Sequence, residues 1–340
     1  MKTNRKVYIS LLSIISAIAV VFLHTNGCFW AFSKSRYWFT ANIIECVFFF
    51  AVPIFFMITG VNLIDYQKKY STKEYFKKRI KKAFIPFIIW SLIGLLYSLI
   101  QKYISINDLS IKYIIDGIMN SKIVSIYWFF PPLFGVYLVL PLFASIKDEK
   151  KDKIFLYLII LYLIIDVLIP FIIGVFHIDL QIPISIFVLS GYFVYVLIGY
   201  LLDKYELKLK YRVLIYISAI LGLIAHIVGT YVLSMKASAI DYTFKGYTNL
   251  PSILYSIGIF IFVKQISKKI PNLKIIDFVS RYTFPIYLMH WFVIDIGLSI
   301  FGFNTLSIIY RLGYPLIIIP ICIGVAFIFR KIPLIKKIVP

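Results

Sequence analysis

Six ionisable side chains stand inside long apolar stretches of this sequence: His24, Glu45, Asp166, His226, His290 and Asp295. Ionisable groups inside such stretches are costly and are therefore candidates for function. His24 lies near the end of the first stretch and Glu45 near the start of the second, at matched depths of roughly 6–8 Å below one membrane surface. A carboxylate that orients an imidazole and stabilises its protonated form supports a general base, so we expect His24 and Glu45 to be catalytic. The alternative is a Glu45 that faces outer water beside an interfacial histidine.

The other four residues divide into candidates and structural residues. His290 lies about 10 Å into a late stretch, and it is either a functional residue or a buried histidine bonded to a neighbouring helix. Asp166 and Asp295 fall near mid-membrane, where they are either proton relays or partners for polar groups across the bundle. We interpret His226 as structural.

A basic segment at 66–82 precedes the sequence "FIPF" and holds eight Lys or Arg residues. Topology explains most of these charges, and attraction to anionic membrane lipid accounts for more. Arg79 and Lys82 stand three residues apart, on one face of a helix. A guanidinium binds phosphate in bidentate fashion, so we expect this pair to bind a phosphate-rich cytosolic donor such as a CoA thioester.

The composition defines the class of protein that must position these residues. Of 340 residues, 61% are hydrophobic and only 15% are charged, with a mean hydropathy of +0.91. These values exclude an ordinary soluble domain and a disordered chain. The net charge of +21 does not indicate a nucleic-acid partner, because the basic residues lie in short runs between apolar stretches.

We therefore predict an all-α, polytopic helical bundle, a single integral membrane domain over residues 1–340. We expect a multi-pass topology in the plasma membrane. Alternating loops hold 28 and 8 Lys or Arg residues, and this asymmetry predicts that both termini are cytoplasmic. Segment 102–122 could lie as an amphipathic helix on the outer interface. About ten transmembrane helices are expected, at 7–29, 41–65, 83–101, 123–146, 154–176, 184–202, 213–235, 249–266, 283–303 and 310–329.

Five stretches, in this order, together resemble the acyltransferase 3 family of membrane-bound acyltransferases, in particular its short bacterial branch. The first helix ends in a histidine, and the second carries a pattern similar to V-P-hydrophobic-F-F-M-I-S-G. Three further motifs follow: a basic loop before a proline, a helix with Trp-Phe, and a late histidine motif. The stretches are "SIISAIAVVFLHTN", "AVPIFFMITGVNLI", "YFKKRIKKAFIPFIIWS", "YWFFPPLFGVYLVLPLF" and "YTFPIYLMHWFVI".

The resemblance implies transfer of an acyl group, usually acetyl, from cytoplasmic acyl-CoA to a hydroxyl of a cell-surface or lipid-linked glycan. It implies that His24 is the catalytic histidine, either as general base or as acyl carrier, and that Arg79 and Lys82 bind the donor. Trp128 and His290 match the two later motifs. One position departs from the family pattern, because Ser13 stands where an arginine is common; Arg5 or Arg79 is a substitute for it.

Two other functions stay open from the sequence: a transporter or flippase for polysaccharide or lipid-linked sugar, suggested by Asp166, Asp295 and many prolines, and a catalytically inactive scaffold, suggested by Ser13. The four histidines are scattered, so we expect no metal site. We also expect no bound cofactor, with acyl-CoA as co-substrate. The sequence leaves the acceptor glycan, the acyl chain and a homo-oligomeric state undetermined.

Overall fold

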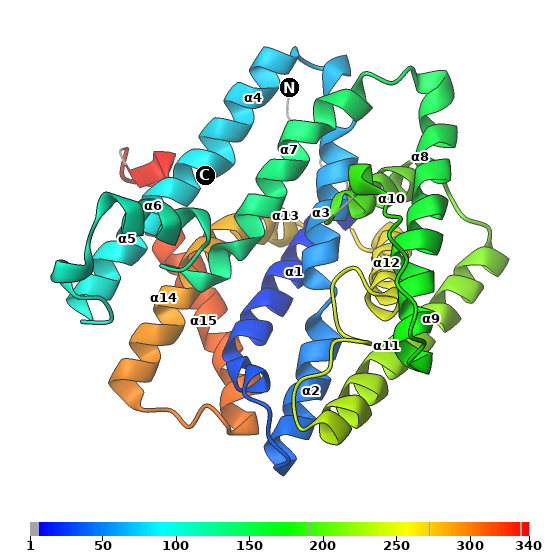
Figure 1. Cartoon of the computed structure of the whole chain (residues 1–340). Coiled ribbons are helices and arrows are strands. Elements are labelled where there is room, and N and C mark those ends of the chain that lie inside the picture. The colour runs from blue at the N-terminus through cyan, green and yellow to red at the C-terminus, as the bar shows by residue number, and fades with distance from the viewer. Residues whose placement is uncertain (1–6, 190, 272, 334, 340) are drawn as a thin grey trace.

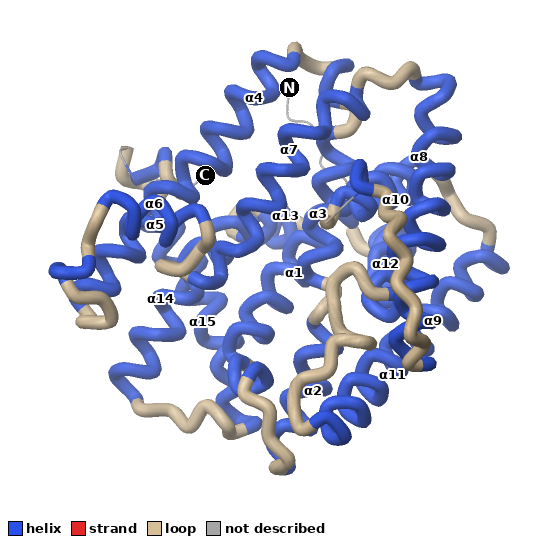
Figure 2. The backbone as a smooth tube through the Cα atoms, viewed as in Figure 1, coloured by secondary structure: helices blue, strands red, loops and turns tan. Residues whose placement is uncertain are grey.

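A computed structural model describes residues 7–189, 191–271, 273–333 and 335–339 of the chain. These residues form helices joined by loops, with no strand among them (Figures 1 and 2). The α-helices are α1 Val7–Thr25, α2 Arg36–Phe48, α3 Ala51–Leu63, α4 Thr72–Arg79, α5 Ile85–Ile100, α6 Ile111–Met119, α7 Phe130–Ala144, α8 Asp148–Tyr162, α9 Ile169–Phe176, α10 Phe193–Lys204, α11 Leu209–Ala237, α12 Leu250–Ile266, α13 Lys274–Ser280, α14 Thr283–Phe301 and α15 Ile308–Phe329.

Shorter helical turns connect several of these helices. Two are π-helices, η3 Ile80–Phe84 and η6 Leu163–Leu168. The others are 3₁₀ turns: η1 Gly27–Trp30, η2 Tyr66–Lys68, η4 Ile106–Asp108, η5 Ser125–Phe129, η7 Phe187–Leu189, η8 Ser267–Lys269 and η9 Ile335–Lys337.

The bundle is a polytopic membrane protein, as the composition predicts. Within the described ranges, nine continuous helical stretches are long and apolar enough to cross a membrane. They are Val7–Thr25, Arg36–Lys68, Thr72–Ile100, Ser125–Ala144, Asp148–Phe176, Leu209–Ala237, Leu250–Lys269, Thr283–Phe301 and Ile308–Phe329. Many large apolar side chains on the outer helices are exposed, for example Leu214 and Leu221 on α11, as expected for surfaces that face lipid.

The expected span at 184–202 differs from the other nine. Residues 178–186 are not helical, and α10 begins only at Phe193. Pro183 lies in this stretch and cannot donate a backbone hydrogen bond, and Gly191 adopts a positive φ of 68° just before the helix. Figure 2 shows the extended segment running back along the bundle from α9 to α10.

Both π-helices have the same local cause. Each ends two residues before a proline, η3 before Pro86 and η6 before Pro170. A proline inside a helix leaves the carbonyl of residue i−4 without its donor and clashes with it. A π turn just before the proline lets the helix continue and re-aims the preceding side chains, so η3 changes the direction of the residues around Arg79.

Two glycines allow α3 and α10 to cross in close contact. A Cβ on Gly60 would lie 1.9 Å from the Val196 carbonyl oxygen, and a Cβ on Gly199 would lie 2.2 Å from the Met57 oxygen. Small residues are what let two helix backbones approach this closely. This contact brings the short helix α10 into the interior, where Phe193 to Tyr200 are all buried.

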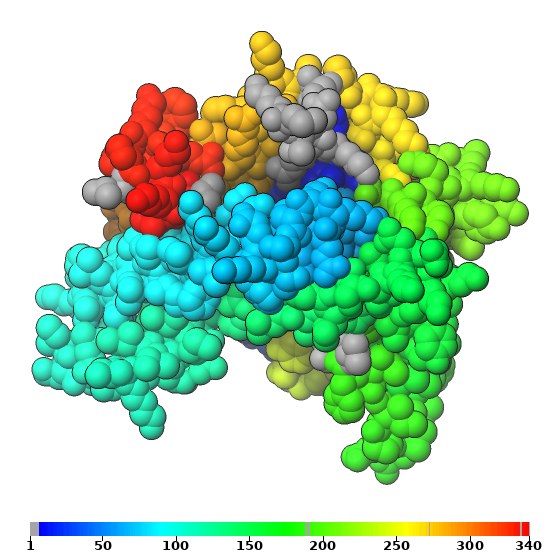
Figure 3. Space-filling view, turned by 90° about the horizontal axis from the view of Figure 1, so that it is seen from above, coloured from blue at the N-terminus to red at the C-terminus, as the bar shows by residue number. Residues whose placement is uncertain are grey.

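Helix α1 occupies the centre of the bundle and packs against α2, α3, α12, α13, α14 and α15. The beginning of α4, the turn before α8 and the described end of the chain at η9 lie at one end of the bundle, shown face-on in Figure 3. This arrangement agrees with the charge sorting of the loops. The basic residues Lys2, Arg5 and Lys6, which contribute to that sorting, lie outside the described residues.

Candidate active site

A cavity of about 860 Å³ lies inside the bundle and contains several residues selected from the sequence. This volume is in the range of small-molecule sites. The wall includes Arg79 and Lys82 from the α4–η3 junction, His24 from α1, Glu45 from α2 and Trp128 from η5. The structure therefore places five of the seven predicted site residues around one space.

The cationic part of the wall is formed by Arg79 and Lys82. Arg79 is half-buried, with its guanidinium carbon 5.6 Å from the ring centroid of Tyr137 and 5.9 Å from that of Tyr75. Its Nε atom is buried and has no hydrogen-bond partner, while Lys82 is exposed. A guanidinium is attracted to the faces of aromatic rings, and its planar fork suits phosphate oxygens.

The ring of His24 lies beside the ring of His290. The sequence singled out both residues but did not predict that they are neighbours. The ring centroids of His24 and His290 are 5.1 Å apart, with the rings tilted by 40°. His290 is fully buried, and its Nδ1 lies 2.9 Å from the Ile286 carbonyl oxygen. Because a carbonyl oxygen only accepts, Nδ1 carries the proton, and Nε2, which has no hydrogen-bond partner, keeps its lone pair.

Glu45 has a different partner from the one expected. Its Oε1 accepts a hydrogen bond from Lys245 Nζ at 3.1 Å, in an ion pair whose side chains are 2% and 1% exposed. Its Oε2 is buried and has no hydrogen-bond partner. The hydrogen-bond partners of Glu45 thus do not include His24, although both residues line the cavity; the contribution of Glu45 to catalysis stays a prediction.

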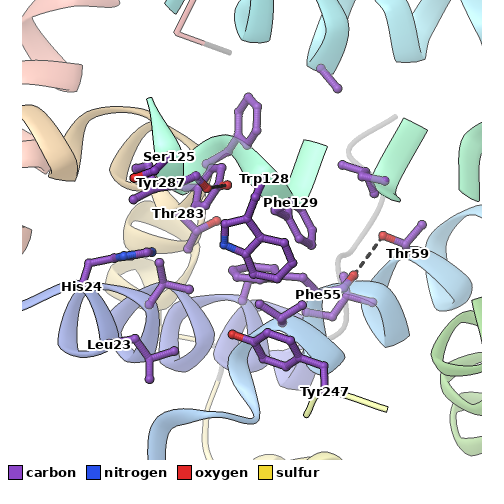
Figure 4. A pocket seen from close by; sticks show the side chains of 18 of the residues that line it. Leu23, His24, Phe55, Thr59, Ser125, Trp128, Phe129, Tyr247, Thr283 and Tyr287 are labelled. Atoms are coloured by element: carbon purple, nitrogen blue, oxygen red, sulfur yellow. Dashed lines mark hydrogen bonds between the residues drawn. The ribbon is translucent and has the colours of Figure 1, made fainter. Parts of the chain in front are cut away.

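Aromatic side chains form much of the remaining wall. Trp128 stacks on Tyr247 with ring centroids 5.4 Å apart, and Figure 4 shows both rings and the His24 imidazole facing the same space. Reciprocal hydrogen bonds fix η5 against α14: Tyr127 donates to the Leu288 oxygen at 2.7 Å, and Tyr287 donates to the Ile126 oxygen. These bonds position Trp128 relative to the helix that carries His290.

The remaining intramembrane candidates lie outside the cavity wall. Asp295 Oδ2 accepts hydrogen bonds from Tyr97 at 2.7 Å and from Tyr103 at 3.0 Å. Asp166 accepts from the Ile186 backbone nitrogen at 2.9 Å and from Ser185, and so fastens the extended segment before α10 to η6. His226 is buried beside Phe49, with ring centroids 5.2 Å apart.

Sequence reasoning missed Lys245 and Tyr247, which both lie in the loop between α11 and α12. A signal for Lys245 exists, because it is one of only eight basic residues in the sparsely charged loops. No sequence signal distinguishes Tyr247 from the other 25 tyrosines. Ser13, at the position where the family commonly has arginine, does line the cavity, and its Oγ donates to the Ile9 oxygen at 2.8 Å.

The structure is thus a bundle of helices long and apolar enough to span a membrane, and a cavity inside it has His24, Glu45, Arg79 and Lys82 in its wall. Residues 6–330 match a family model described as an acyltransferase domain. The chain therefore belongs to the acyltransferase 3 family and is a membrane-embedded acyltransferase. No curated protein and no solved structure gives a match.

Proposed function

We propose that this acyltransferase moves an acyl group, usually acetyl, from cytoplasmic acyl-CoA to a hydroxyl of a cell-surface or lipid-linked glycan. The observation that supports this proposal is the single cavity shared by Arg79, Lys82 and His24. A polar donor is held at its cationic part while the reacting thioester lies deeper, beside the histidine.

The donor is bound through its phosphates. CoA is too polar to enter lipid, so its phosphates stay near Arg79 and Lys82, and its pantetheine arm extends along the largely apolar wall formed by Phe129, Leu133 and Tyr137. Binding energy from this remote part of the donor holds the thioester in a reactive position.

His24 carries the chemistry by one of two routes. As general base, it takes the proton from the acceptor hydroxyl while the oxygen attacks the thioester carbonyl; the C–S bond then breaks, and protonated His24 returns the proton to the CoA thiolate. As acyl carrier, its unprotonated ring nitrogen attacks the thioester carbonyl, the C–S bond breaks, and the thiolate takes the proton from the other ring nitrogen, which gives CoA thiol and acyl-His24. The acceptor hydroxyl then attacks the acyl carbon, the N–C bond breaks, and the hydroxyl proton returns to the imidazole. Both routes form one ester and one thiol.

The experiment measures acetyl transfer to membrane glycan and release of CoA thiol by purified protein in lipid nanodiscs. His24→Ala should lower the transfer rate by about 10²–10⁴-fold, because general-base help contributes that much. His177→Asn is the matched control, since His177 is exposed outside the cavity wall and asparagine tolerates its φ of 50°.

A His24→Ala protein that is folded and transfers acetyl at the wild-type rate would remove this mechanism. Wild-type protein that releases no CoA thiol and forms no ester would remove the enzymatic function and favour the scaffold. Glycan movement across the membrane without ester formation would favour the transporter.

A further inference from the structure

The inference concerns the part of the cavity near Glu45 and Trp30, where the wall differs from the Arg79 region. The carboxylate of Glu45 and the aromatic rings of Trp30, Trp128 and Tyr247 all contribute to it. Trp30 lies in η1, directly after α1, and is 54% exposed, so this part of the cavity approaches the surface.

Glu45 has hydrogen-bonding capacity left over after its ion pair. Lys245 satisfies Oε1 only, and Lys245 itself is enclosed by rings, with Nζ 3.7 Å from the Phe49 centroid and 4.7 Å from the Phe29 centroid. Oε2 is a buried carboxylate oxygen without any donor. Leaving such an acceptor unpaired is unfavourable, so a ligand that supplies an O–H or N–H gains by binding there.

The chemistry of this wall selects the kind of ligand. A sugar ring presents C–H groups on its face, which pack on the negatively polarised face of an aromatic ring, and O–H donors around its edge. An acyl chain has no donor to offer to Glu45 Oε2. An anionic headgroup would place a second negative charge beside the carboxylate, whereas the neutral hydroxyl of a sugar does not.

We infer that Glu45 and Trp30 form an acceptor subsite that binds a neutral sugar, with one sugar hydroxyl donating to Glu45 Oε2 and the ring packed on an aromatic face of the wall. This subsite rests on the proposed function, since it supplies the acceptor to His24. It gives Glu45 a role in holding the acceptor, and it gives Lys245 the role of fixing the carboxylate and the loop that carries Tyr247.

The experiment uses the full chain in nanodiscs with acetyl-CoA and octyl β-D-glucopyranoside as the probe acceptor. Two quantities are measured separately: the probe concentration for half-maximal transfer, and CoA thiol release without the probe. Glu45→Gln should raise the half-maximal probe concentration at least tenfold, because it removes one charge-assisted hydrogen bond to the acceptor.

A second variant separates hydroxyl binding from the ion pair. Replacing both partners, Glu45→Leu with Lys245→Met, removes the buried charges together, a change that cores commonly tolerate. The double variant should show the same tenfold or larger increase in the half-maximal probe concentration. Wild-type half-saturation in the double variant would overturn the subsite, because it would show that Glu45 acts only through Lys245.

Two substitutions of Trp30 and one control variant test the aromatic part of the subsite. Trp30→Ala should also raise the half-maximal probe concentration, and Trp30→Phe should restore most of it. Phe39→Ala is the control, because Phe39 is 41% exposed and is not part of the cavity wall. Wild-type protein that releases CoA thiol but transfers no acetyl to the probe would overturn the sugar subsite alone, whereas failure of CoA release itself would count against the proposed function.

Discussion

At the scale of single residues, the main result is that His24 has His290 as its ring neighbour, while Glu45 is held by Lys245. The Ile286 carbonyl fixes the tautomer of His290 and leaves its Nε2 free to accept a proton. We therefore expect His290 to position the proposed catalytic residue.

We predict that His290→Phe lowers kcat for acetyl transfer by about 10²-fold, the cost expected when a reacting group is misplaced by about an ångström. The KM for acetyl-CoA should stay unchanged, because His290 does not line the cavity. The measurement is the steady-state kcat and KM of His290→Phe, with His290→Ala for comparison. Full kcat in His290→Phe would show that the residue serves only to fill space.

We predict that Arg79→Ala raises the KM for acetyl-CoA about tenfold or more, because a charge-assisted phosphate contact is lost. Arg79→Lys should restore only part of the affinity, since a lysine lacks the planar fork. Lys77→Ala, on the same helix but outside the cavity wall, is the matched control. An unchanged KM in Arg79→Ala would reduce the basic segment to a topology signal.

At the scale of helices, the junction between α10 and α11 is fastened to α12 by charge. Lys264, on α12, donates from Nζ to the carbonyl oxygens of Leu202, Asp203 and Tyr205 at 2.8–3.1 Å. A buried ammonium at a helix C-terminus satisfies carbonyls that have no partner within the helix. Glu206 adds ion pairs with Lys264 at 3.0 Å and Lys268 at 2.8 Å.

This junction gives a stability prediction with a defined pH range. The hydrogen bond from Lys268, with a further bond from Lys264, lowers the pKa of Glu206 to about 2 from an ordinary value of 4.5. A depressed carboxyl pKa stabilises the folded state above about pH 4.5, and this contribution disappears as the pH falls toward 2. Glu206→Gln should therefore lower the Tm slightly at pH 7, since the carboxylate is 56% exposed.

The measurement is the Tm of both proteins in nanodiscs at pH 7 and pH 3. The difference between wild type and Glu206→Gln should be smaller at pH 3. A difference that is equal or larger at pH 3 would show that the ionised carboxylate is not the source of the stabilisation.

At the scale of the whole molecule, the arrangement of helices supports a fixed orientation in the membrane. The η2–α4 turn lies at the same end of the bundle as the α7–α8 turn and η9. We predict that this end is cytoplasmic, because these two turns and η9 belong to the basic segments of the chain. The donor site at Arg79 requires that orientation.

Cysteine labelling in intact cells tests it. In a variant whose Cys28, Cys46 and Cys322 are replaced by serine or alanine, Lys69→Cys should react with a membrane-impermeant maleimide only after the cells are opened. Lys34→Cys, which is exposed at the opposite end, should react in intact cells. Labelling of Lys69→Cys from outside would invert the topology and remove the cytoplasmic donor.

Much of the architecture follows from the sequence alone. Apolar stretches of about 20 residues must form helices in a membrane, because lipid offers no partner for free backbone groups. The approximate bounds of nine of the ten expected spans were therefore predictable, as was the family, from motifs in a fixed order. The exception is the expected span at 184–202. Pro183 and the contacts of Asp166 keep residues 178–186 extended, and hydrophobicity alone does not reveal this.

The site was predictable only in part. Local spacing identified His24, Arg79 and Lys82, whose chemistry and depth can be read from one helix each. The partners of His24 and Glu45 come from residues 266 and 200 positions further along the chain, His290 and Lys245. Such pairings depend on which helix faces meet, and helix packing is set by side-chain shape at each crossing and not by hydrophobic content. The sequence thus determined that this protein is a membrane helical bundle with a basic segment before Pro86, and the tertiary structure decided which polar groups share the cavity, because that depends on which helix faces meet.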